Sequence, residues 1–385
     1  HGLVGSLAHG LVGSLAHGLV HGRDRGRYPG GRHVGEGGTV TRAEVPAHRP
    51  RRRPPSQADV AALADVSTQT VSRVANALPN VDEETRSRVL SAMQALGYQR
   101  NSAARALALG RFHVFGVVSF DLSAHGNART LAAISRAAQT AGYSLTVACA
   151  EEPTENAVQQ AFFKLTGQAV DGVVVIEAQI LDRGSLHLPA GVPVVVADGD
   201  PEHHVSSVDN NQAAGAAAAT RHLLDLGHRT VWHVGGPQDS YSARRRTAAW
   251  RATLTAAGVR VPPLRLGDWT AESGYQVGLE LAARDDVTAI FAGNDHMALG
   301  IMLAMHEAHR TVPRDVSVVG FDDVPEAAFY HPPLTTVHQD FEEVGRQCVS
   351  LLLDQIAADG TGTGTVISVS PNLVVRASTA PPPPA

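Results

Sequence analysis

The chain has 385 residues, of which 43% are hydrophobic and 18% are charged, and its formal net charge is −5 at pH 7. That length allows two or three domains with full-sized cores, and the composition is that of a soluble globular protein. The net charge excludes a chain that is basic throughout, and no run of 18 apolar residues is present to cross a membrane.

Residues 1–55 lack the pattern of a folded domain. The unit HGLVGSLA occurs twice in succession, a fragment of it follows, and Gly, Arg and Pro then dominate. Without a core-forming pattern we expect this segment to be disordered. A signal peptide is disfavoured, because Gly and His interrupt the apolar stretch and no basic segment precedes it. The arginines at 49 and 51–53 either add non-specific phosphate contacts or belong to a solvated tail.

Residues 56–76 predict two short helices joined by a tight turn. Ser56–Asp59 is a capping-box pattern, and Val60, Leu63 and Ala64 then recur at helical spacing. Asp65–Ser67 breaks the first helix, and the serine at its end can cap the second helix.

The second of these helices has a polar face. Val71 and Val74 lie three residues apart and should face the first helix, which leaves Thr68, Gln69 and Arg73 on the other side. In a DNA major groove Gln pairs with adenine edges, Arg with guanine, and the Thr methyl group contacts a thymine methyl. The alternative is a helical hairpin with a solvated polar face.

A third helix should complete a compact headpiece. Asp82 can cap it, Val89, Met93 and Leu96 would form its buried face, and Gly97 would end it. Arginines within and after this region supply part of a basic patch, although acidic residues offset them in number: Arg73, Arg86, Arg88, Arg100 and Arg105. Binding to DNA through such contacts should weaken as salt rises.

The order of these residues resembles the LacI/GalR family of transcription regulators. The matching stretches are DVAALADVSTQTVSRVAN and VDEETRSRVLSAMQALGYQRNSAARALALG. The resemblance implies a hinge helix at about Asn101 to Leu107, with Leu107 inserting into the minor groove and kinking the DNA. It also implies the following DNA-binding residues: Thr68, Gln69, Ser72, Arg73, Asn76, Asn101 and Leu107. Asp65 stands where the family usually has Gly, and Asp tolerates the left-handed conformation better than most residues.

From Phe112 onward, apolar strands alternate with helices, which predicts an α/β core of two doubly wound parallel sheets. Two of the helices should span 128–141 and 156–165. The apolar runs fall at 114–118, 145–148, 173–176 and 194–197, then at 231–234, 289–292 and 316–319.

The resemblance implies that this core is two-lobed and like a periplasmic binding protein. We therefore expect these divisions: a disordered segment at 1–55, a helix-turn-helix headpiece at 56–100, a hinge at 101–111, a sugar-binding and dimerisation core at 112–378, and a disordered tail at 379–385. Within the core, the first lobe should comprise about 112–209 and 341–368, and the second about 210–338 and 369–378.

Polar residues follow several of the apolar runs. Ligands of open α/β sheets bind beyond the carboxyl ends of the strands, so these positions are the candidates for a site. A single carboxylate there often just caps the next helix, but several together with an arginine and a tryptophan suit a sugar. Carboxylates and a guanidinium hydrogen-bond its hydroxyls, and a flat ring covers its CH face.

Residues 230–341 look particularly like a lactose-responsive member of the family. The stretches SAR, GDW, SG, NDHMALG, VSVVGFDD and PPLTTVHQDF stand in matching order. Phe120 and Asn127 depart from that member, so the near wall of the pocket should differ. A β-galactoside is the first candidate ligand. The ligand-binding residues that the resemblance implies are Asp198, Ser242, Arg246, Trp269, Asn294, Asp322, Gln339 and Phe341. As alternatives, Trp269 could be a core residue at the rim, and Phe341 could serve packing alone.

The sequence therefore predicts a repressor that binds a pseudopalindromic operator as a homodimer and that a small sugar releases. No terminal leucine heptad follows VVRASTAPPPPA, so a dimer is expected rather than a tetramer. Cys149 and Cys348 show no zinc spacing and should be buried thiols in a reducing compartment, which favours the cytoplasm.

We expect no cofactor, no metal and no enzymatic activity. The histidines at 228, 233, 306 and 309 lack a shared-face metal spacing. Asp322 and Asp323 are adjacent on a strand and so point to opposite faces, which argues against joint acid–base work on a glycosidic bond. The main alternative function is that of a periplasmic-type sugar-binding protein without DNA binding.

Overall fold

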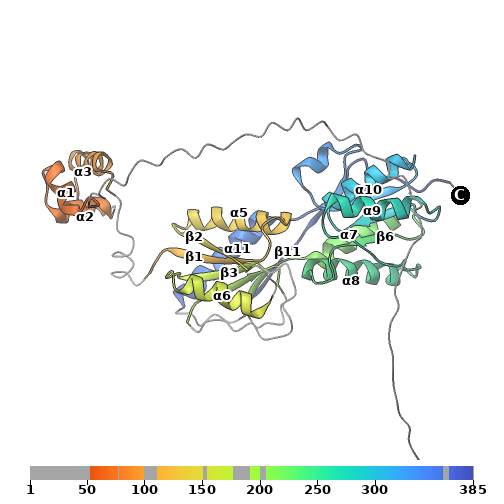
Figure 1. Cartoon of the computed structure of the whole chain (residues 1–385), viewed down its shortest axis with the longest axis horizontal. Coiled ribbons are helices and arrows are strands. Elements are labelled where there is room, and N and C mark those ends of the chain that lie inside the picture. The colour runs from red at the N-terminus through yellow and green to blue at the C-terminus, as the bar shows by residue number, and fades with distance from the viewer. Residues whose placement is uncertain are drawn as a thin grey trace, which may run out of the picture. The chain divides into compact units, whose positions relative to one another are not determined.

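The computed structural model describes residues 53–76, 78–98, 111–150, 154–176, 191–199, 205–358 and 364–384 (Figure 1). The chain divides between residues 99 and 100 into two compact units, a small helical one and a large α/β one. Within these ranges no helix combines the length and apolarity that crossing a bilayer requires.

The small unit consists of three helices, α1 (Gln57–Ala64), α2 (Thr68–Ala75) and α3 (Glu83–Leu96), each with a side-chain cap as predicted. At the start of α1, the Ser56 backbone N–H donates to the Asp59 carboxylate at 2.7 Å, and the serine hydroxyl accepts from the Asp59 N–H at 3.3 Å. Asp65 ends this helix in the left-handed conformation, with φ 52°.

The remaining caps of the headpiece also follow the prediction. Ser67 accepts the Thr70 N–H at 3.0 Å and Asp82 accepts the Thr85 N–H at 2.8 Å. Gly97 ends α3 with φ 62°, a conformation that costs glycine little.

A small apolar cluster holds the three helices together. Val60, Val71 and Val89, one from each helix, have no exposed surface. Leu63 recurs with Val60 and Ala64 at helical spacing, but it does not share their burial, because 54% of it is exposed. Val60, Ala61 and Ala64 form the inward side of α1 instead, so Leu63 faces solvent.

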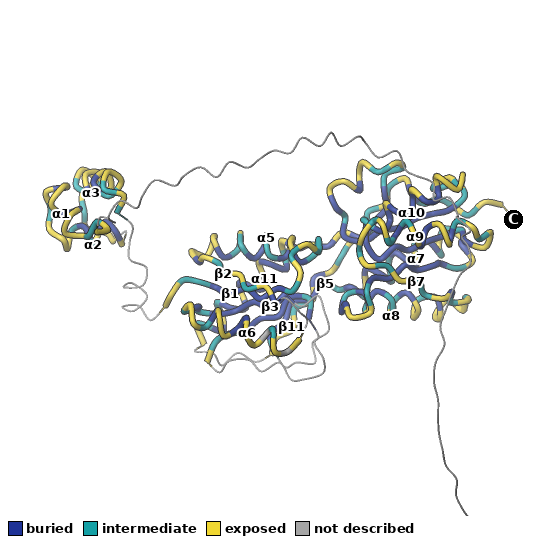
Figure 2. Tube along the Cα trace, viewed as in Figure 1, coloured by how far each residue is buried: buried dark blue, intermediate teal, exposed yellow. Residues whose placement is uncertain are grey.

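The first sheet of the large unit is entirely parallel, with the strand order β11-β5-β4-β3-β1-β2. Helices α5 (His125–Thr140) and α11 (Phe341–Ala357) pack on one face, and α6 (Glu155–Thr166) packs on the other (Figure 2). Its strands are β1 (Val114–Ser119), β2 (Ser144–Cys149), β3 (Gly172–Ile176), β4 (Val194–Ala197), β5 (Ser206–Asn210) and β11 (Val366–Val369).

One of the two predicted buried thiols is not buried. Cys348 on α11 lies fully inside the first lobe, whereas Cys149 at the end of β2 is exposed. Strand β2 is the outermost strand of its sheet and pairs only with β1, so its side chains are at most half-buried. The apolar residues of this run do not reveal whether the strand lies at the edge or in the middle of its sheet.

The second sheet has the order β12-β10-β9-β8-β6-β7, and only β12 runs antiparallel to its neighbour. Helices α7 (Gln212–Asp225) and α8 (Tyr241–Ala256) cover one face, and α9 (Ala271–Ala282) and α10 (Asp295–Glu307) the other. A 3₁₀ helix spans Pro325–Phe329. The strands are β6 (Trp232–Gly235), β7 (Arg265–Leu266), β8 (Ala289–Ala292), β9 (Ser317–Asp322), β10 (Thr335–His338) and β12 (Asn372–Val374).

The predicted fold class of two parallel α/β lobes is confirmed, and the seven apolar runs correspond to seven of the observed strands. Strand β5 was not expected, because its sequence SSVDN is mostly polar, although all five residues are buried. The described chain passes between the sheets three times: from β5 to α7, from β10 to α11, and from β11 to β12. Two of these crossovers place Gln212 and Gln339 where the lobes meet.

Candidate functional site

Helix α2 exposes the polar face that the sequence predicted. Thr68, Gln69, Arg73 and Asn76 are exposed and Ser72 is half-buried, while the valines of this helix are buried. Within the described part of the chain, no side-chain hydrogen bond occupies Gln69 or Arg73, so their donors and acceptors face solvent. Asn101 and Leu107, the other two predicted DNA-binding residues, lie outside the described residues.

The large unit contains a cavity of about 410 Å³ between its two lobes, and all eight predicted ligand-binding residues line it. The first lobe contributes residues after β1 and β4 and at the start of α11, and the second contributes residues after β6, β7, β8 and β9. The residues that the structure brings together are Asp198, Ser242, Arg246, Trp269, Asn294, Asp322, Gln339 and Phe341.

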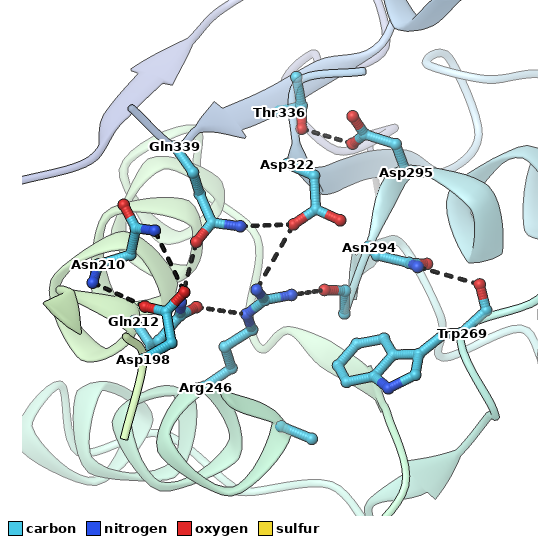
Figure 3. Close-up of polar contacts among 12 residues, drawn as sticks. Asp198, Asn210, Gln212, Arg246, Trp269, Asn294, Asp295, Asp322, Thr336 and Gln339 are labelled. Carbon is cyan, nitrogen blue, oxygen red and sulfur yellow. Dashed lines mark hydrogen bonds and ion pairs between the residues drawn. The ribbon is translucent and has the colours of Figure 1, made fainter. Parts of the chain in front are cut away.

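Arg246 lies at the centre of the polar floor of this cleft (Figure 3). Its Nε donates to Gln212 Oε1 at 2.8 Å, one terminal nitrogen donates to the Gly293 carbonyl oxygen, and the other lies 3.5 Å from the Asp322 carboxylate. The guanidinium also stacks over the Phe321 ring, 3.7 Å from its centroid. Helix α8 thus carries a buried guanidinium whose orientation is fixed by these hydrogen bonds and by the contact with the Phe321 ring.

The two crossover glutamines extend this network between the lobes. Gln212 Nε2 donates to Gln339 Oε1 at 2.9 Å, and Gln339 Nε2 donates to Asp322 at 2.7 Å (Figure 3). All of these side chains are buried. Burial raises the pKa of Asp322, and the neighbouring Arg246 lowers it. A chain of hydrogen bonds therefore runs from one crossover, through the other, to the floor of the cleft.

Asp198 lies at the carboxyl end of β4 in the left-handed conformation, with φ 52°. Its carboxylate accepts the Asn210 backbone N–H at 2.8 Å and faces that residue's side-chain amide at 3.5 Å. Burial raises the pKa of Asp198. Two of the lone pairs on this carboxylate are thus engaged by β5, which fixes its direction toward the cavity (Figure 3).

The indole of Trp269 forms one side of the cleft and is held in a fixed place. Asn294 donates to the Trp269 carbonyl oxygen at 3.0 Å and uses its own oxygen to cap α10 at Met297. A Cβ atom on Gly236 would come within 2.3 Å of the ring, so only glycine allows this approach. Trp269 also packs against the core of the second lobe, so it is a core residue at the rim as well as part of the lining of the cavity.

The first lobe closes the opposite side of the cleft. Phe341 is 5% exposed, lines the cavity, and meets the His125 ring edge to face at 6.2 Å between centroids. Asn127 also lines the cavity and donates to the Asp121 carbonyl oxygen at 2.7 Å. Phe120, in contrast, packs against the core of the first lobe.

Several residues of the cleft were missed from the sequence. Gln212 follows β5, so recognising that polar strand would have pointed to it by the same strand-end rule. His125 and His296 lie in the first turns of helices that follow a strand end, but neither belongs to the set of carboxylates, arginine and tryptophan by which the sequence pointed to a sugar site. Asp295 lies behind the cleft, where it accepts hydrogen bonds from Thr336 Oγ1 and the Val324 N–H.

Asp322 and Asp323 do diverge as predicted, although β9 ends at Asp322 and Asp323 lies just beyond the strand. Asp322 faces the cleft, whereas Asp323 pairs with Arg376 and with His338. The described ranges contain no group of three His, Cys, Asp or Glu side chains placed to hold a metal ion.

Two family models match the sequence. One, described as bacterial regulatory proteins of the lacI family, matches residues 58–101, and the other, a periplasmic binding protein-like domain, matches residues 220–379. The lactose operon repressor of Escherichia coli K12 is 35% identical over 334 residues, covering 86% of this chain and 92% of that protein. The transcriptional regulator CelR of Thermobifida fusca is also 35% identical, over 346 residues, covering 85% and 99%.

Solved structures give the same result. A lac repressor dimer bound to operator and the anti-inducer ONPF matches with a TM-score of 0.76 at 33% identity, covering 85% of this chain and all (100%) of that one. A CelR–cellobiose complex matches with a TM-score of 0.63 at 33% identity, covering 84% and 99%. These matches span most of the chain rather than one lobe.

Proposed function

The chain belongs to the LacI family of bacterial regulatory proteins, and from this we propose that it is a transcriptional repressor controlled by a sugar in the cleft of its core. The similar proteins are repressors and regulators by name, so we assign no enzymatic reaction. A repressor of this kind acts on the chromosome in the bacterial cytoplasm.

The headpiece is the proposed DNA-binding part. Gln69 and Arg73 lie one turn apart on α2, where they can reach successive base edges in a major groove. Thr68, Ser72 and Asn76 share that helix, and Asn101 and Leu107 complete the proposed set of contacts. One such helix covers a half-site, so a homodimer would read a pseudopalindrome. The operator-bound lac repressor structure that this chain resembles is itself a dimer.

The cleft is the proposed sugar site. Asp198, Asn294 and Asp322 offer acceptors for hydroxyl groups, Arg246 offers donors, and the Trp269 indole offers a flat apolar face. Ser242, Gln339 and Phe341 complete the lining. A β-galactoside is our first candidate, and a glucose-based disaccharide is the second because a similar regulator is known in complex with cellobiose.

One observation carries the proposal: the groups that would hold the sugar are hydrogen-bonded to both crossover glutamines. Gln212 bonds Arg246, and Gln339 bonds Asp322. A ligand that changes the placement of these groups therefore changes the junction of the lobes. If the DNA-bound form has one arrangement of the lobes and the sugar favours another, each ligand weakens the binding of the other by the same factor.

The test is operator binding with and without sugar. The full chain selects its operator from a random duplex library, and fluorescence anisotropy then measures affinity in the presence of lactose, cellobiose or no sugar. We expect one sugar to weaken operator binding about 5- to 150-fold, the range of typical coupling energies. A chain that selects no duplex but still binds sugar would be a sugar-binding protein without DNA binding, contrary to the proposal.

A further inference from the structure

We propose that the cleft takes an uncharged saccharide of at least two sugar units, with the outer unit lying against the paired rings of His125 and His296. This inference rests on the proposed function, because it takes the cleft as the effector site. It goes further by naming the size and charge of the effector and the residues that select them.

The cleft has a buried floor and a more exposed outer part. Arg246, Asn294, Asp322 and Gln339 are buried, and they engage one another or their own elements. The outer part contains exposed or half-buried residues from both lobes: Asp121, Ser123, His125, Asp268, Thr270 and His296. The cavity of about 410 Å³ falls within the range of roughly 300–1,000 Å³ typical of pockets for drug-sized ligands, which are larger than one hexose.

The two histidines form a second set of sugar-binding groups, separate from the floor. His125 begins α5 in the first lobe, and His296 lies in the first turn of α10 in the second. Their ring centroids are 5.9 Å apart, with the planes inclined at 59°, so they meet across the cleft. Neither ring forms a hydrogen bond with any residue that the structure describes, although both line the cavity.

Unpaired imidazoles at this position suit a second sugar unit. An imidazole ring offers its two nitrogens to hydroxyl groups, together with a flat surface for the CH face. Burial lowers the pKa of His125, so this ring is neutral at pH 7 and adds no positive charge. A sugar unit at the floor alone would leave these groups to water.

The charges of the cleft exclude an anionic ligand. Four carboxylates line it, Asp121, Asp198, Asp268 and Asp322, and Arg246 is the only Lys or Arg among the described lining residues. That guanidinium already faces Asp322 and donates to Gln212 and to the Gly293 carbonyl. A phosphate or carboxylate on the ligand would thus meet surplus negative charge without a free cation to compensate it.

The experiment is calorimetric titration of the full chain with lactose and cellobiose, and with galactose and glucose as the single units. The quantity of interest is the ratio of disaccharide to monosaccharide affinity. His125→Ala and His296→Ala should each reduce this ratio about tenfold, which corresponds to about 1.4 kcal/mol. His306→Ala removes an exposed histidine from the same helix as His296 and should leave the ratio unchanged.

Cellobiose 6′-phosphate and glucose 6-phosphate test the charge. Each should bind at least about tenfold more weakly than its unphosphorylated form, since like charge in the cleft disfavours it. Equal or tighter binding of a phosphorylated sugar would overturn the inference, and so would an unchanged affinity ratio in both histidine variants.

The failure of this inference is distinguishable from that of the proposed function. If a monosaccharide alone releases the operator as fully as a disaccharide, the proposed repressor function is supported and the outer subsite is wrong. If none of these sugars binds the chain or alters its affinity for DNA, the proposed sugar response and the outer subsite are both wrong.

Discussion

The functional residues of the headpiece and those of the cleft are brought together in different ways. In the headpiece, the exposed polar face belongs to one helix of eight residues, and each cap lies within three residues of the N–H group that it accepts. In the cleft, Asp198, Arg246 and Asp322 are separated by dozens of residues and meet only because the carboxyl ends of strands from both sheets face the cavity. The first site depends on local pattern and the second on topology, so they should respond differently to substitution.

Arg246→Ala should have the largest effect and should separate the two regions. Sugar affinity should fall at least about 100-fold, because hydrogen bonds to a charged group contribute about 1.5–3 kcal/mol each. Operator affinity without sugar should stay within about threefold, since a change of that size is below 1 kcal/mol. Titration and anisotropy on the same preparation measure both quantities.

Two further variants guard this prediction against a folding defect. Arg246→Lys keeps a positive charge beside the buried Asp322 but loses the planar fork that reaches two partners at once, so it should fold and still lose sugar affinity. Arg244→Ala removes an exposed arginine from the same helix and should behave as the unchanged chain. Sugar release that persists in Arg246→Lys would contradict the assignment of Arg246 to the site.

Gln69→Ala tests the other region. It should remove base discrimination at one half-site position, worth about 1–3 kcal/mol for a bidentate contact. Sugar affinity should not change, because Gln69 belongs to the helical unit and is not one of the residues that line the cleft. Gln94→Ala on the exposed side of α3 is the matched control. An altered sugar affinity in Gln69→Ala would mean that the two regions do not function separately.

Two aspartates extend the comparison, because the pKa of one is lowered in the headpiece and the pKa of the other is raised in the core. Hydrogen bonds from Ser56 lower the pKa of the exposed Asp59, whereas burial raises the pKa of Asp295 to about 8. The unfolded chain loses the Asp295 proton near pH 4. Between about pH 4 and pH 8 the folded state therefore binds the extra proton, and its stability falls as pH rises.

Asp295→Asn should remove this pH dependence. Relative to the unchanged chain, its Tm should rise by about 2–4 °C or more between pH 5 and pH 8, the shift expected for each 1 kcal/mol in a domain of this size. Differential scanning calorimetry across that pH range measures the difference. Asp239→Asn, an exposed aspartate just before α8, is the control for loss of charge. A constant Tm difference would show that Asp295 is ionised throughout.

The smallest effect belongs to a single cap. Ser67→Ala should destabilise α2 by about 1 kcal/mol, whereas Ser67→Gly should cost only a few tenths. Because the proposed base-contacting residues lie on this helix, operator affinity should fall about fivefold in Ser67→Ala and hardly at all in Ser67→Gly. Equal losses in both variants would point to a direct DNA contact of the serine hydroxyl instead of a cap.

The same contrast explains what could be predicted from the sequence. Caps, helix limits and the polar face of α2 follow from spacing within one turn, and they were predicted residue by residue. The parallel sheets and the strand-end residues of the cleft followed from apolar runs, with the family resemblance narrowing the choice. Strand β5 was not predicted because most of its buried residues are polar, and Gln212, which follows it, was therefore not predicted either. The exposure of Leu63 and Cys149 depends on which neighbours pack against them, which periodicity does not contain.

The hydrogen bond between Gln212 and Gln339 connects two of the three described chain segments that join the lobes. Each glutamine also bonds a charged residue at the floor of the cleft, so any rotation of the lobes about these segments displaces the Arg246–Asp322 pair. Sensitivity to the effector can therefore drift during evolution through either amide while the charged and aromatic residues of the pocket stay the same. Relatives that share those residues would, by this route, respond to very different concentrations of one compound.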